Sequence, residues 1–342
     1  MLVIEKYNYS LHNPTWRFTL GPETYETRDT PKRVEAIKKA LSADRRFSFR
    51  TAQHFPPALL ARMHPYHDFI KRVSQAARRT GEEMYPDLFP GEGAGLRRKV
   101  HPLWGGLFCT DAVTPIMGRT YEVAKGSAEA AMTGAQLLIE GKRREVYALC
   151  RPSGHHAGPR VFGGYCYFNN TAVAAQMLSA KGRVAVLDID YHHGNGTQEF
   201  FQTRRSVFTC SIHADPNVEY PYFWGYAGER GRGKGRGANL NIPLPRGTKD
   251  GAYLRAVDKA VRAIRRFRPA FLVVGSGFDT HRDDPIGGFH LTTEIYSEVG
   301  RRLARVDCPI LVCQEGGYNL DVLGQCAHGL LSGLADARRV AP

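Results

Sequence analysis

Residues 184–196, VAVLDIDYHHGNG, place an apolar run directly before Asp188, Asp190, His192 and His193. Strands buried in a parallel sheet read as continuous apolar runs, so the first part of this stretch predicts such a strand. Ligands of open α/β sheets bind beyond the carboxyl ends of the strands, which is where these acidic and imidazole groups fall. This clustering favours a functional site over a polar turn that merely follows a core strand.

The same stretch predicts a metal site. Asp190 and His192 are two positions apart, so in extended backbone their side chains point to one side and can reach one ion. Carboxylate and imidazole ligands suit Zn²⁺ or Fe²⁺. Residues 271–280, FLVVGSGFDT, repeat the design of an apolar strand, glycines and an aspartate. Asp279, which alone would be interpreted as a solvated loop residue, is therefore the expected third ligand.

Two more apolar segments end in reactive side chains. Residues 145–150, EVYALC, lead into His155 and His156, and residues 309–314, PILVCQ, lead into a double glycine and Tyr318. These groups are expected beside the metal ligands, because the carboxyl ends of neighbouring parallel strands meet at one edge of a sheet. Metal ligands, paired imidazoles and a phenol together are the inventory of a metal hydrolase.

Four motifs resemble the signature segments of the histone deacetylase superfamily. They are RPSGHHA at 151–157, DIDYHHGNGT at 188–197, GFDT at 277–280 and EGGY at 315–318. The likeness spans about residues 1–335 and is strongest to the bacterial acetylpolyamine amidohydrolases and class II-like deacetylases. It implies an α/β, arginase-like deacetylase fold, with a central eight-stranded parallel sheet flanked by helices. It also implies zinc-dependent removal of acetyl groups from amines.

The resemblance gives each motif residue a role. It implies zinc at Asp190, His192 and Asp279, His155 paired with Asp188, His156 paired with Asn195, Tyr318 as oxyanion donor, and structural potassium at Asp188, Asp190, His192, Ser211 and Ile212. A carboxylate partner favours the imidazolium form. We therefore expect His155 to be the more basic histidine, and His156 to stay neutral and act as the base.

Aromatic residues near the motifs predict the walls of a narrow substrate tunnel. Gly164 and Tyr165 are expected on one side, Tyr222 or Phe223 on the other, and Ile286 beside them, although such aromatics could equally belong to the core. Residues 84–105 form a long loop rich in Pro and Gly, which is often functional in compact domains. The resemblance implies that this loop forms a homodimer contact and narrows the tunnel; a mobile surface loop is the alternative.

The composition sets the wider limits. The chain has 342 residues, of which 42% are hydrophobic, enough for one large domain or two ordinary ones. Apolar strands alternate with helical stretches such as residues 248–266, and no long linker intervenes, so a single catalytic domain over residues 1–342 is expected. Scattered cysteines without CxxC spacing and the lack of a signal-like or membrane-spanning run predict a cytoplasmic protein with reduced thiols.

The net charge of +14 bears on the substrate. Residues 228–237, GERGRGKGRG, form the densest basic stretch; a solvated loop is the simpler interpretation, and nucleic-acid binding is not expected. The segments expected at the mouth, NPTWRF at 13–18 and RRKVHPLW at 97–104, lack a carboxylate. A basic rim repels polyamines. The sequence therefore predicts weak selection for polycations, unless Glu219 or a partner subunit supplies acidic groups.

The predicted function is zinc-dependent removal of acetyl groups from acetylated amines, of the acetylpolyamine or acetyl-lysine type. Alternatives are protein lysine deacylation, deacylation of another neutral or acidic small amide, and a non-catalytic binding protein that keeps the fold. The complete set of ligands, histidines and tyrosine argues against the binding protein. An arginase-type manganese hydrolase would be expected to show more carboxylates for two metals.

Overall fold

The apolar runs form an eight-stranded sheet in the computed structural model, which describes residues 1–20, 23–86, 89 and 106–340. In sheet order the strands are β4 (Ser48–Thr51), β1 (Leu2–Glu5), β5 (Glu145–Ala148), β10 (Ile310–Gln314), β9 (Phe271–Ser276), β6 (Val184–Asp188), β7 (Val207–Ala214) and β8 (Asn239–Leu244). All neighbouring pairs are parallel. The expected α/β fold with a central eight-stranded parallel sheet is confirmed.

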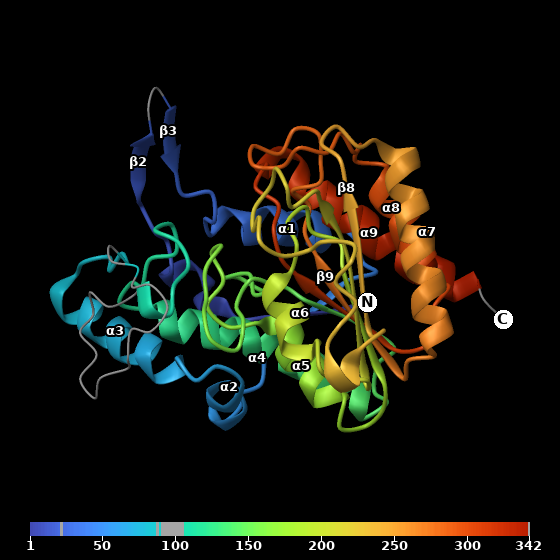
Figure 1. Cartoon of the computed structure of the whole chain (residues 1–342), viewed down its shortest axis with the longest axis horizontal. Helices are drawn as coiled ribbons and strands as arrows, with labels where there is room; N and C mark the ends of the chain where they lie inside the picture. The colour runs from blue at the N-terminus through green and yellow to red at the C-terminus, as the bar shows by residue number, and fades with distance from the viewer. Residues whose placement is uncertain (21–22, 87–88, 90–105, 341–342) are drawn as a thin grey trace.

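Helices cover both faces of the sheet (Figure 1). One face packs against α1 (Lys32–Ser42), α7 (Asp250–Phe267), α8 (Ile295–Leu303) and α9 (Leu320–Val340). The other packs against α2 (Ala58–Met63), α3 (His67–Thr80), α4 (Thr120–Ile139), α5 (Asn170–Leu178) and α6 (Asn195–Phe201). Strand β6 shows why its sequence is continuously apolar: Ala185 and Leu187 join the first core, whereas Val184 and Val186 join the second.

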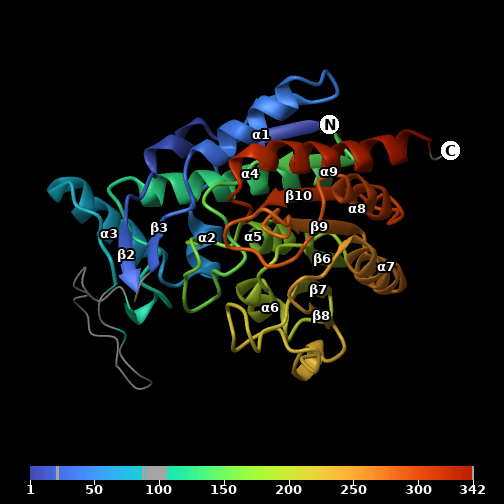
Figure 2. The same cartoon turned by 90° about the horizontal axis from the view of Figure 1, so that it is seen from above.

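The strand register aligns the ends that carry the motifs. Ala148 pairs with Cys313, Cys313 with Gly275, Gly275 with Asp188, and Asp188 with Ser211. This row passes through the last residue of β5 and of β6, the next-to-last residue of β10 and of β9, and the middle of β7. The loops that follow these strands therefore emerge together at one edge, as the sequence predicted. In Figure 2, β10, β9, β6, β7 and β8 follow one another down the view in the order of the sheet.

Smaller elements complete the fold. Strands β2 (Arg17–Leu20) and β3 (Glu23–Glu26) form an antiparallel hairpin that stands away from the central sheet in Figure 1. Short 3-10 turns occupy Tyr7–Leu11 and Gly233–Gly235. The seven cysteines are buried free thiols. Among the described helices, none combines the length and apolar character needed to cross a lipid bilayer.

Candidate active site and metal centre

The three expected metal ligands lie together at the ends of β6 and β9. The Nδ1 atom of His192 is 3.1 Å from Oδ2 of Asp279 and 3.4 Å from Oδ1 of Asp190. The ligand atoms of all three side chains lie within 4.8 Å of one another. Backbone N–H groups orient the carboxylates: Tyr191 donates to Asp279 and Gly316 donates to Asp190, at 2.9 and 2.8 Å.

The electrostatics of this cluster fit a bound cation. Burial, together with the neighbouring Asp190, raises the pKa of Asp279 to about 7. Burial lowers the pKa of His192, but its contacts with both carboxylates outweigh this effect and raise the pKa to about 10. Two buried carboxylates need a compensating positive charge, because uncompensated buried charge is strongly unfavourable. An imidazolium or a metal ion supplies that charge, and two carboxylates with one imidazole form a donor set suited to zinc.

Glycines leave room for the ligands. A Cβ atom on Gly277 would collide with the carboxylate of Asp190, and one on Gly316 would press against the carboxylates of both Asp190 and Asp279. The absence of a side chain at these two positions is thus what allows β9 and β10 to end beside the cluster. The glycines of the GFDT and EGGY motifs have a steric reason in this structure.

The tandem histidines lie in the loop between β5 and α5, and each has a different partner. Nδ1 of His155 is 3.0 Å from Oδ2 of Asp188, and Nδ1 of His156 is 2.8 Å from Oδ1 of Asn195. The structure thus forms both of the pairs expected from the sequence. Since an amide oxygen only accepts hydrogen bonds, neutral His156 carries its proton on Nδ1 and keeps a free lone pair on Nε2.

The two imidazoles have opposite pKa shifts. Burial lowers the pKa of His155, but Asp190 and Asp188 outweigh it and raise the pKa to about 10. Burial, reinforced by the charges of His155 and His192, lowers the pKa of His156 well below its usual value. One histidine is therefore a fixed cation, and its neighbour is a neutral group that can accept a proton.

Asn195→Asp tests this pair through the pH profile. The new carboxylate would face Nδ1 of His156, at the position where Asn195 now accepts its hydrogen bond. A close opposite charge raises a histidine pKa by about 1–3 units. A base works only when deprotonated, so the acid limb of kcat/KM should move to higher pH by about that amount. The profiles of the wild type and the variant, with metal content measured in both, check this; superimposable acid limbs would contradict it.

Tyr318 follows a turn at the end of β10 that several buried groups hold in place. Gly317 adopts φ 110°, a conformation that side chains disfavour. The N–H of Tyr318 donates to Oδ2 of Asp284 at 2.6 Å. Arg33 lies 4.6 Å over the phenol ring and donates from Nε to the Gly317 carbonyl at 2.6 Å. Burial raises the pKa of Tyr318 well above its usual value, so the hydroxyl keeps the proton that it would donate.

The buried carboxylate of Asp29 holds Arg33 in place. Asp29 accepts hydrogen bonds from Arg33 at 2.6 Å and from Arg151 at 3.1 Å. Arg151 opens the loop that carries the histidines. Arg33 donates to carbonyls of residues 315–318, the turn after β10 that carries Tyr318 and is called here the tyrosine turn. The carboxylate of Asp29 thus bridges the supports of the two turns. Sequence reasoning missed Arg33 and Asp29, since charged residues at the start of a helix are ordinarily solvated.

One cavity connects His156, Tyr318 and the expected metal ligand His192. Its volume is about 220 Å³, and it is lined by Asp111, Val113, His156, Gly164, Tyr165, His192, Tyr220, Ile286 and Tyr318. Gly164, Tyr165 and Ile286 are thus placed in the wall, where the sequence put them. A narrow cavity with aromatic and aliphatic walls suits a slender apolar chain.

The opposite wall differs from the sequence prediction. Tyr220 lines the cavity, and its ring lies 4.8 Å from the ring of His156, nearly perpendicular to it. Tyr222 and Phe223 are 49% and 83% exposed, so the prediction of either as the wall was wrong. The physical reason is the path of the loop: Tyr222 adopts φ 57°, and the chain leads outward after Tyr220.

Asp111 is an acidic wall residue that the sequence analysis missed. Its Oδ2 accepts the N–H of Gly164 at 2.6 Å, and its Oδ1 accepts from the N–H of Val113 and the hydroxyl of Thr114, each at 2.8 Å. Burial raises its pKa. The carboxylate therefore serves first to fix Gly164, which adopts φ 58° against the ring of His156. No local pattern distinguishes this residue from a loop aspartate.

The remaining predictions concern the potassium site and the two segments expected at the mouth. Asp188, at the end of β6, pairs in register with Ser211 on β7, and its Oδ1 accepts the N–H of Asp190 at 3.0 Å, so these three potassium candidates lie close together. The potassium site itself remains a prediction. Most of the 84–105 loop, including residues 97–104, lies outside the described residues. Residues 13–17 of the other mouth segment are described.

Known proteins resemble this chain along most of its length. Residues 27–334 match the histone deacetylase domain family. Acetylpolyamine amidohydrolase 1 of Pseudomonas aeruginosa is 40% identical over 91% of this chain and 92% of its own length. Acetylpolyamine amidohydrolase of Burkholderia pseudomallei is 36% identical over 99% of this chain and all of its own length. A crystal structure of the acetylpolyamine aminohydrolase from that organism superposes with a TM-score of 0.92, covering 98% of this chain and 99% of that one.

Proposed function

Because the chain belongs to the histone deacetylase family, whose members are deacetylases, we propose that it is a zinc-dependent amidohydrolase acting on small acetylated amines. The observation that carries this proposal is the 220 Å³ cavity in which His156, His192 and Tyr318 meet. A neutral imidazole, a metal ligand and a phenol that share one narrow cavity are what hydrolysis of an unactivated amide requires.

The chain's own residues would divide the work. Asp190, His192 and Asp279 would hold Zn²⁺, which when bound polarises a carbonyl and lowers the pKa of water. Nε2 of His156 would accept the proton of the attacking water and return it to the leaving amine. The Tyr318 hydroxyl would donate to the oxygen that becomes negative in the transition state. His155, paired with Asp188, would keep a fixed positive charge beside the cluster.

For the amine, the proposal follows the relatives, which are named acetylpolyamine amidohydrolases. Two described carboxylates near the cavity already have partners within the protein, however. Both oxygens of Asp111 accept hydrogen bonds from the protein, and Glu219 pairs with Arg246 at 2.8 Å. Arg230, Arg232, Lys234 and Arg236 of the basic stretch are all exposed. We therefore propose an acetylpolyamine-type substrate with modest selection for charge.

Kinetics at two salt concentrations test the substrate. Metal-loaded protein should hydrolyse acetylputrescine, acetylspermidine and a neutral acetyl-lysine amide with efficiencies that differ only modestly. Surface charges act over a Debye length of about 8 Å at physiological salt, so attraction to a polycation weakens as salt rises. We expect little fall, or a gain, for the polycation. A strong preference for it that collapses in salt would show that acidic groups reach the mouth from undescribed residues or a second subunit. No hydrolysis of any acetylated amine would overturn the proposed function.

A further inference from the structure

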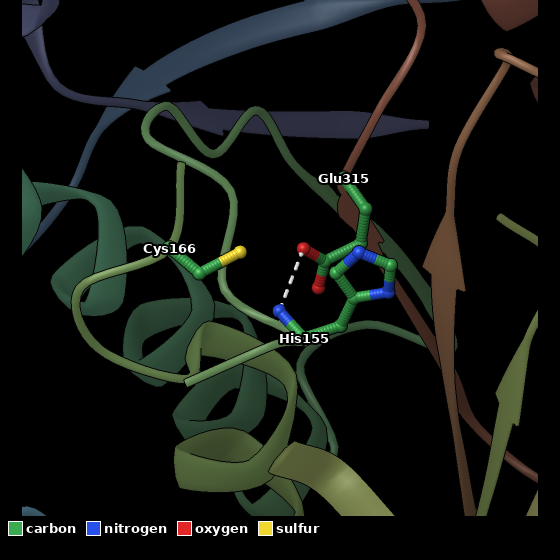
Figure 3. A group of neighbouring side chains, drawn as sticks. All are labelled: His155, Cys166 and Glu315. Carbon is green, nitrogen blue, oxygen red and sulfur yellow. Dashed lines mark hydrogen bonds between the residues drawn. The ribbon is translucent and has the colours of Figure 1, made fainter. Parts of the chain in front are cut away.

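Glu315 is a fully buried carboxylate to which the chemistry above gives no task. It follows β10 and points its side chain under the histidine turn, defined here as residues 151–157. One carboxylate oxygen, Oε2, accepts the backbone N–H of Gly154 at 2.6 Å and that of His155 at 3.1 Å. The other, Oε1, accepts the hydroxyl of Thr171 at 2.7 Å. Figure 3 shows the carboxylate facing the backbone nitrogen of His155 while the imidazole lies to one side.

The main chain of the same residue belongs to the tyrosine turn. Its N–H donates to the carbonyl of Ser276 on β9 at 2.9 Å, and its own carbonyl accepts from Arg33 at 2.5 Å. Tyr318 follows three positions later. A single residue thus joins the turn that carries the base to the turn that carries the oxyanion donor, by side chain on one side and by backbone on the other.

A second metal site is the competing interpretation of this cluster. Glu315, His155 and Cys166 each place a potential ligand atom within 4.8 Å of the others (Figure 3). Most of their possible ligand atoms are already engaged, however. Both carboxylate oxygens accept hydrogen bonds, Nδ1 of His155 faces Asp188, and the thiol of Cys166 donates to the Gly164 carbonyl at 3.4 Å. A metal would have to break these bonds in a closed interior, so the cluster favours a structural connection.

We propose that Glu315 is a positioning residue that sets the placement of the histidine turn relative to Tyr318. This inference rests on the proposed function, because it assigns His156 and Tyr318 to one reaction. The role depends on the reach of the side chain, since its three hydrogen-bond partners are all donors and two of them are backbone N–H groups of the histidine turn. A displacement of about 1 Å in a catalytic group can lower a rate by about 10²-fold.

Two substitutions separate reach from charge. Glu315→Gln keeps the length: its amide oxygen can accept both N–H groups, and its NH₂ can donate to Thr171, whose hydroxyl can also accept. Glu315→Asp keeps the charge but withdraws the oxygens by roughly one C–C bond, about 1.5 Å. We expect kcat of the Gln variant within about 3-fold of wild type, and kcat of the Asp variant lower by about 10- to 10²-fold. KM should change little in both, because neither substitution touches the cavity wall.

Tyr147→Phe is the matched control for lost stability. The Tyr147 hydroxyl donates to Oε1 of Gln314 at 2.5 Å. Gln314 is buried and directly precedes Glu315 in the sequence. Removing that hydroxyl destabilises the fold without touching the histidine turn, so Tm should fall while kcat stays near wild type. Melting temperature and metal content are measured for all variants.

Hydrogen–deuterium exchange gives a readout that does not require turnover. The amides of Gly154 and His155 are held by Glu315, so a peptide covering residues 151–157 should exchange slowly in the wild type and the Gln variant, and faster in the Asp variant. If the wild type hydrolyses none of the tested amides, that result counts against the proposed function alone. The exchange measurement still tests the positioning role of Glu315 in that case. Equal exchange in all three proteins, or a Gln variant with kcat 10-fold or more below wild type, would overturn the role. The Gln result holds even if the Asp variant fails to fold.

Discussion

The variant His156→Ala is expected to lose amide hydrolysis by roughly 10²–10⁴-fold, the usual contribution of general acid–base catalysis. The structure gives the reason: Nδ1 of His156 is held by Asn195 at 2.8 Å, and the ring lines the cavity beside His192. With its pKa lowered well below the usual value, the imidazole is deprotonated at neutral pH and ready to accept a proton. Alanine removes this group and replaces it with nothing that can carry a proton.

Metal content decides whether that loss is one of chemistry. His156 is not among the expected ligands, so the alanine variant should bind as much metal as the wild type by elemental analysis. His328→Ala is a suitable control, because His328 lies on α9 and pairs with Asp44 outside the cavity. The control should keep wild-type turnover. Wild-type turnover in the His156 variant would remove this residue from the mechanism, and a loss of metal would reassign its role.

The positions of the candidate catalytic side chains could be predicted because each follows a strand that is readable from its own sequence. His155, Asp190, Asp279 and Tyr318 are far apart in the chain, yet a parallel sheet brings all carboxyl ends of its strands to one edge. An apolar run followed by Asp, His or Tyr is therefore enough to place them. The pairing of Asp188 with Gly275 and Ser211 in the register then fixes their relative positions.

The supports of the site could not be predicted in the same way, because they depend on tertiary contacts. Arg33 lies near the start of a helix, where an arginine ordinarily faces water. Its contacts with the Gly317 carbonyl and the Tyr318 ring arise only when the chain has folded. Asp111 becomes a wall residue only because its loop returns to Gly164. Glu315 could be read as part of a motif but not as the anchor of a turn 160 residues away.

The tunnel wall shows how a loop defeats prediction from sequence. The segment around Tyr220 is aromatic throughout, so composition identifies the segment but not the residue. Which ring points inward depends on backbone angles, here the positive φ of Tyr222. A shift of two positions moved the prediction from Tyr220, a half-buried ring that lines the cavity, to Tyr222, an exposed one. Strands have a fixed alternation of side chains, whereas a loop of this kind has none.

Asp279→Ala and Asp190→Ala are each expected to abolish high-affinity zinc binding, while the wild type binds about one ion per chain. Each substitution leaves one carboxylate and one imidazole, fewer protein ligands than a catalytic zinc site normally uses. Elemental analysis after dialysis measures the effect directly. Asp283→Ala is the matched control: this neighbouring aspartate is largely exposed and faces Arg282, so its loss should leave the metal in place. Full zinc in either ligand variant would contradict the assignment.

Thermal unfolding extends this test to the protein without metal. Asp190 repels Asp279 in the buried cluster and contributes to the raised pKa of Asp279. In the metal-free Asp279→Ala variant, relief of this repulsion should therefore offset part of the free energy of unfolding that is lost with the hydrogen bond from Tyr191. Zinc should stabilise the wild type by about 2.7 kcal/mol when the free ion is at 100 times its Kd, because it binds the folded state. The Asp279→Ala variant should show no such rise in Tm with added zinc. An equal rise of Tm in both proteins would show that zinc binds without Asp279, and therefore at another site.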